Sequence, residues 1–314
     1  MKTLNVKRSL LIALALATSP IAFAKTVNVE MSAQEVNIAI DNAGNKQAMW
    51  TFDGTIPGPV IRVKEGDTVN FTLTNPKTNK QSHSMDFHAA QVDVLEEFSA
   101  VKPGSSKQFT FDANYPGVFI YHCGAEAMSE HIARGMYGVI IVDPKAGYSE
   151  DYPRPDREYV IVEGDLFAAG TKPSDITMGI GWQASLINGK VFHYDPVHDA
   201  NAELALESKP GERVRIFFVN ANINESVGFH PIAGIWDRVW DNGNPKNLKF
   251  GLQTVDVAPA HGMTFDLISP ANKDTNNAIV NHRMKRALNG AISVLLNHES
   301  LDSDIGKDGN LVLR

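Results

Sequence analysis

Short runs of β-branched and aromatic residues, separated by Gly, Pro, Asn and Asp, follow one another through most of the chain. Apolar and polar side chains alternate within these runs, as expected for strands with one buried face. In the first half, the pattern predicts strands at residues 60–63, 68–73, 108–111, 117–121 and 138–142. Turn signals at this spacing indicate an all-β protein made of sandwich or barrel domains, with only short helical segments such as residues 284–288.

A similar order of elements occurs twice. Glu-Gly-Asp-Thr-Val at residues 65–69 and Pro-Gly-Glu-Arg-Val at residues 210–214 each lead into an alternating strand. In each half, one histidine follows that strand and another precedes the last strand: His83 and His122, then His230 and His282. The repetition predicts two tandem β-sandwich domains of one type. A polar stretch rich in Pro and Gly separates them, so we expect domains at residues 25–147 and 155–314.

The first 24 residues have the features of a secretory signal peptide. Lys7 and Arg8 precede an apolar run at residues 10–17, and Ala22-Phe23-Ala24 matches a cleavage site. We therefore expect an exported protein, most simply a periplasmic one. The net charge of −7 argues against nucleic acid and against anionic membrane surfaces as partners.

The chain contains one cysteine, Cys123, followed by His131 and Met136. In an oxidising compartment, a lone thiol is vulnerable to oxidation unless something occupies it. A thiolate, two imidazoles and a weak axial thioether are the ligands of an electron-transfer copper. The second imidazole is expected from residues 82–88, which contain His83 and His88.

Side chains alternate between the two faces of a strand, so residues an odd number of positions apart face opposite ways. His83 and His88 are five apart, and His122 is adjacent to Cys123. One upstream histidine therefore shares a face with Cys123, and the other shares a face with His122. Parity does not decide which. Either arrangement predicts two metals linked through a single peptide unit.

Two histidines leave the second site incomplete, because catalytic metals commonly have three protein ligands and one open position. His282, at the place in the second half that matches His122, is the best third ligand. Asp86 lies two residues before His88, on the same face. Together with His230, it provides an acid and an imidazole for proton-coupled chemistry.

Residues 82–90, 121–136, 229–240 and 281–291 resemble the copper-containing nitrite reductases. This family has two tandem cupredoxin domains, which are Greek-key β-sandwiches, and works as a homotrimer. The resemblance implies that His83, Cys123, His131 and Met136 bind type 1 copper. It also implies that His88, His122 and His282 bind type 2 copper, with His282 supplied by a neighbouring subunit. Asp86 and His230 match the catalytic pair, and Ile232 matches the apolar residue of the substrate pocket.

The implied activity is dissimilatory: nitrite is reduced to nitric oxide by one electron, as in denitrification. Each subunit is expected to hold one type 1 and one type 2 copper. A small periplasmic donor, a cupredoxin or a c-type cytochrome, is expected to deliver the electron to the type 1 centre, from which it passes along Cys123 and His122. By the same resemblance, Asp86 delivers a proton to nitrite and His230 helps to supply the second.

Three other functions compete with this interpretation. A two-domain multicopper oxidase needs a His-Cys-His run, but Gly124 follows Cys123. An electron carrier needs only the first site and leaves His88, His122 and His282 unexplained. A copper-binding or sensor protein without turnover remains open, because a sequence identifies ligands and not catalysis.

Overall fold

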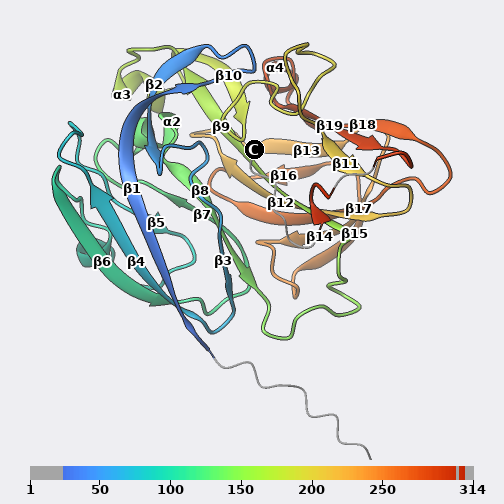
Figure 1. Ribbon diagram of the computed structural model, residues 1–314, viewed down its shortest axis with the longest axis horizontal. Coiled ribbons are helices and arrows are strands. Elements are labelled where there is room, and N and C mark those ends of the chain that lie inside the picture. Colours follow the sequence, from blue (N-terminus) through green and yellow to red (C-terminus); the bar gives the residue numbers. More distant parts are fainter. Residues whose placement is uncertain (1–23, 302–303, 308–314) are drawn as a thin grey trace, which may run out of the picture.

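The computed structural model describes residues 24–301 and 304–307, so the predicted signal peptide, residues 1–24, lies outside the described residues apart from Ala24. Two β-sandwiches lie side by side, one formed by the first half of the chain and the other by the second half (Figure 1). Among the described residues, no helix combines the length and the apolar character needed to cross a membrane.

The first sandwich packs two four-stranded sheets face to face. One sheet has the order β2-β1-β4-β6, with β1 Thr26–Ala39, β2 Lys46–Phe52, β4 Thr68–Asn75 and β6 Ser105–Asp112. The other has the order β3-β8-β7-β5, with β3 Ile61–Lys64, β5 Asp86–Phe87, β7 Gly117–His122 and β8 Tyr137–Asp143. Two short helices, α1 Val94–Glu97 and α2 Met128–Ala133, lie in its loops.

The second sandwich has larger sheets. The six-stranded sheet has the order β10-β9-β12-β17-β14-β15, with β9 Arg157–Phe167, β10 Trp182–Ile187, β12 Arg213–Ala221, β14 Trp236–Asp241, β15 Leu248–Leu252 and β17 Gly262–Ile268. The five-stranded sheet has the order β11-β19-β18-β13-β16, with β11 Leu206–Ser208, β13 Val227–Pro231, β16 Val255–Val257, β18 Thr275–Asn281 and β19 Ile292–Asn297. The helices are α3 Pro173–Thr177 and α4 Met284–Ala287.

Strand pairing repeats between the halves. The first strand pairs in parallel with the strand after the repeated turn, as β1 with β4 and β9 with β12. The last strand pairs antiparallel with its predecessor and in parallel with an earlier strand: β8 with β7 and β3, and β19 with β18 and β11. The predictions of an all-β fold and of two tandem domains of one type are confirmed. Each predicted strand of the first half is present, and no strand falls within residues 144–156.

The two sandwiches share an apolar contact made by β7 and β8 of the first domain and by β9 and β12 of the second. Val118 and Ile141 pack there in one cluster with Val160 and Phe217. The backbones approach so closely that a Cβ on Gly262 would lie 2.1 Å from the Val118 carbonyl oxygen, so only glycine fits at that position. This contact holds β7 rigidly against the second domain, and His122 and Cys123 stand at the end of β7.

Candidate metal centres

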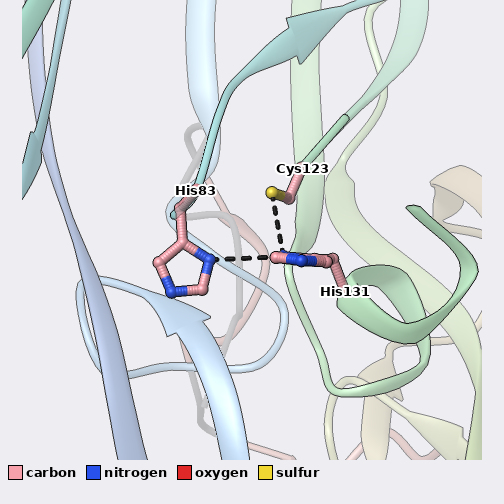
Figure 2. A group of neighbouring side chains, drawn as sticks. All are labelled: His83, Cys123 and His131. Carbon is pink, nitrogen blue, oxygen red and sulfur yellow. Dashed lines mark hydrogen bonds between the residues drawn. The ribbon is translucent and has the colours of Figure 1, made fainter. Parts of the chain in front are cut away.

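The first centre consists of His83, Cys123 and His131, which point toward one another (Figure 2). His83 is held by a bridge to Val101, Cys123 directly follows β7, and His131 lies on α2. The Nδ1 atom of His131 lies 3.2 Å from the Cys123 sulfur and 3.3 Å from the Nδ1 atom of His83. All three side chains are buried.

The chemistry of this group fits a soft metal ion. Burial raises the pKa of the Cys123 thiol, and burial together with neighbouring His83 lowers the pKa of His131 to about 4. Neutral imidazoles are metal ligands, and a bound cation would replace the proton on sulfur. The Ser84 backbone N–H donates a hydrogen bond to the Cys123 sulfur at 3.2 Å. Hydrogen bonds of this kind tune the potential of a thiolate-bound copper.

Met136 lies in the loop that carries two of these residues. Its side chain is fully buried, its backbone N–H donates to the His131 carbonyl at 3.1 Å, and its own carbonyl accepts from the Cys123 N–H at 3.0 Å. Trp50, from β2, packs beside both histidines, with its ring centre 4.7 Å from that of His131 and 5.6 Å from that of His83. The pattern of the sequence did not reveal this tryptophan as part of the site.

The second group brings together Asp86, His88 and His122. The Nε2 atoms of the two histidines lie 3.1 Å apart, and an Asp86 carboxylate oxygen lies 3.9 Å from the Nε2 atom of His122. The His122 Nδ1 atom donates a hydrogen bond to the Cys123 carbonyl at 3.1 Å, which leaves Nε2 free for a metal. Phe87 turns the opposite way into the core, so Asp86 and His88 share one face.

The other predicted residues lie on the second domain. His230 and His282 stand next to each other, with ring centres 5.4 Å apart, and line a groove of about 400 Å³. His282 and Ile232 are exposed. The His230 Nδ1 atom donates to the Gln253 carbonyl at 2.8 Å. Within one chain, His282 belongs to neither of the two ligand groups of the described residues.

The chain as a whole is similar to known copper proteins. A family model described as multicopper oxidase matches residues 32–147. The chain is 36% identical over 284 residues to a copper-containing nitrite reductase of Neisseria meningitidis, an alignment that covers 86% of this chain and 69% of that relative. The chain belongs to the copper-containing nitrite reductases.

Solved structures of this family agree with that assignment. The copper nitrite reductase of Nitrosomonas europaea is 50% identical, with a TM-score of 0.88 over 92% of this chain and 100% of that one. The copper-containing nitrite reductase of Thermus scotoductus is 28% identical, with a TM-score of 0.77 over 88% of this chain and 63% of that one. As a member of the copper-containing nitrite reductases, this protein is a copper oxidoreductase with cupredoxin domains.

Sequence reasoning also missed a buried polar network behind His282. Glu163 and Asp165 lie on β9, which is buried along its whole length. They contact Asn281 and Arg286, on either side of His282. The signal was present, because carboxylates such as Glu163 and Asp165, which follow the apolar run Tyr159-Val160-Ile161-Val162, need a special reason to be buried.

Proposed function

We propose that this protein reduces nitrite to nitric oxide and water, consuming one electron and two protons for each nitrite. The observation that carries the proposal is the position of the two ligand groups relative to each other. Cys123 belongs to one group and His122 to the other, so a single peptide unit connects them. An electron carrier or a storage protein has no use for a second, open centre at that point.

In this proposal, type 1 copper is held by His83, Cys123, His131 and Met136, and type 2 copper by His88, His122 and a neighbouring chain's His282. Copper would supply one-electron transfer at the first centre and, at the second, a Lewis acid with an open position for nitrite. The neutral state that burial imposes on His83 and His131 and the free Nε2 atom of His122 support these assignments.

Proton delivery falls to Asp86 and His230. The Asp86 carboxyl lies on the same face as the ligand nitrogens of His88 and His122. Once it is protonated, it can donate a hydrogen bond to a bound oxyanion and pass its proton to the oxygen of that anion. Because the Nδ1 atom of His230 is engaged by the Gln253 carbonyl, its Nε2 atom is the one that gives or takes a proton. Ile232, two residues after His230, has an exposed apolar side chain, and in this proposal it limits how nitrite can lie.

The functional unit in this proposal is a homotrimer. His88 and His282 are both exposed within one chain; His88 belongs to a group with only two imidazoles, and His282 to neither ligand group. A second copy that presents its His230 and His282 groove to Asp86 and His88 would complete the second copper site, and cyclic symmetry repeats the contact around the ring. The protein works in the periplasm, takes its electron from a small cupredoxin or c-type cytochrome and serves denitrification.

The test combines copper content with nitric oxide release from nitrite and a reduced one-electron donor. The proposal expects two coppers per chain and continuous turnover. His282→Ala should lose the second copper and the turnover but keep the thiolate–copper absorption, whereas His198→Ala, an exposed histidine outside both groups, should behave as wild type. Two coppers without nitric oxide would overturn the proposed reaction.

A complementation experiment tests the shared site. His88→Ala and His282→Ala should each be inactive alone. When the two chains are mixed within trimers, about a quarter of the contacts would join an intact His88 to a neighbouring intact His282, so about a quarter of the activity should return. Failure to recover activity in verified mixed trimers would exclude a ligand donated between subunits.

A further inference from the structure

Near its end, the buried strand β9 carries the carboxylates of Glu163 and Asp165, which the proposed reaction does not use. They are two residues apart, so they extend from the same face of the strand. Their residues are 1% and 3% exposed. Burying such groups is costly unless hydrogen bonds or opposite charges satisfy them, so their partners indicate what they are there to hold.

Both carboxylates hold residues that flank His282. Glu163 Oε1 accepts hydrogen bonds from the amide of Asn281 at 2.8 Å and from the amide of Asn222 at 3.1 Å. Asp165 forms a buried ion pair with Arg286, which lies in α4, the short helix that follows His282. The exposed His282 is therefore fastened at both ends to one rigid strand.

Asn281 also connects His282 to β13, the strand that carries His230. Its side-chain Oδ1 accepts from the Gly228 N–H at 3.2 Å and from the Arg283 N–H at 3.1 Å. The His282 N–H in turn donates to the Gly228 carbonyl at 2.7 Å. One amide side chain thus ties the residues before and after His282 to β13, and its own orientation depends on Glu163.

We propose that Glu163 and Asp165 are positioning residues for the second copper centre, forming a buried clamp that presets His282 for a neighbouring chain. The clamp rests on the proposed function only in taking His282 as a copper ligand. A ligand side chain that crosses a subunit boundary binds the metal more tightly when it is already held in place before assembly. Less conformational entropy is then lost on binding.

The test replaces Glu163 in two ways. Glu163→Gln keeps an acceptor oxygen for Asn281, whereas Glu163→Leu keeps the volume and removes the acceptor. The leucine variant should bind the second copper about 10–100-fold more weakly, the usual effect of losing a residue that orients a ligand. The glutamine variant should bind it as wild type does. The thiolate–copper absorption of the first centre should be unchanged in both.

A second readout needs no metal. In the copper-free protein, the backbone amides of residues 281–283 should exchange with solvent faster in Glu163→Leu than in wild type, and Glu163→Gln should restore slow exchange. If Glu163→Leu does not fold, Asn281→Ser removes the other partner of the same hydrogen bond. This variant should also bind the second copper more weakly and exchange the amides of residues 281–283 faster than wild type. Both readouts remain informative if wild type binds two coppers but does not reduce nitrite, so the clamp and the proposed reaction can fail separately.

Two results would overturn the clamp. One is a leucine variant that keeps the second copper and slow exchange at residues 281–283. The other is parallel loss of both coppers in the leucine and glutamine variants, because that would mean general destabilisation and not a specific effect on His282.

Discussion

Glu163 should make the stability of this protein depend on pH, and Glu163→Gln should remove that dependence. Burial raises the pKa of the Glu163 carboxyl from 4.5 to about 7, although the amides of Asn281 and Asn222 and the positive charge of Arg286 oppose the shift. The negative charge of neighbouring Asp165 adds to it, and Tyr137, across the domain contact, faces the same acids. The folded protein therefore keeps a proton on Glu163 at pH values where the unfolded chain has released it.

The direction and the size of the pH effect on stability follow from this difference between the folded and the unfolded pKa of Glu163. Stability from Glu163 is fully present below about pH 4.5 and is lost as the pH rises to about 7, above which the contribution is constant. A rise from 4.5 to about 7 corresponds to about 3 kcal/mol of unfolding free energy, at about 1.4 kcal/mol per pKa unit. Between about pH 5 and pH 8, the wild type should lose about 2–3 kcal/mol that Glu163→Gln does not lose.

The assay is guanidinium unfolding of the copper-free protein at several pH values in this range. All other titrating groups are common to wild type and variant, so the difference between the two curves isolates Glu163. Glu299→Gln, at an exposed position, is the matched control and should run parallel to wild type. If the Glu163→Gln curve also runs parallel to wild type, the carboxyl is not held protonated in the folded state and the reasoning is wrong.

Three further outcomes are expected. Asp86→Asn should keep both coppers but lower the rate of nitric oxide release about 10²–10⁴-fold, the range for a lost proton donor; an undiminished rate would remove Asp86 from proton transfer. Phe87→Ala should cost about 3–5 kcal/mol in guanidinium unfolding, because its buried ring packs against Phe71, Phe111 and Tyr121; a cost below about 1 kcal/mol would show that β5 is not anchored by this ring. Removing copper with a chelator should lower the thermal midpoint, because the metal binds only the folded chain; an unchanged midpoint would mean that copper does not bind the folded chain more tightly than the unfolded one.

The alternating strands and the chemistry of the metal ligands could be predicted from the sequence, because both depend on residues that are close together in the chain. Period-two alternation places every second side chain on the same face, so the adjacent pair His122 and Cys123 had to serve opposite sides of β7. A lone thiol followed by His131 and Met136 restricted the first centre to a soft metal. The tandem repeat was also visible, since both domains begin their central strand after the same kind of turn.

Only the tertiary structure decided whether His83 or His88 lies with Cys123, a choice that strand parity left open. The bridge between His83 and Val101 and the burial of Phe87 place His83 with Cys123 and leave His88 with His122. Packing of the second domain likewise places His282 on an exposed face, away from both ligand groups of its own chain, with Glu163 behind it. These arrangements depend on contacts between residues as far apart in the sequence as Asp165 and Arg286, which are separated by 121 positions. Sequence periodicity specifies which side chains share a face, and only long-range packing specifies which faces meet.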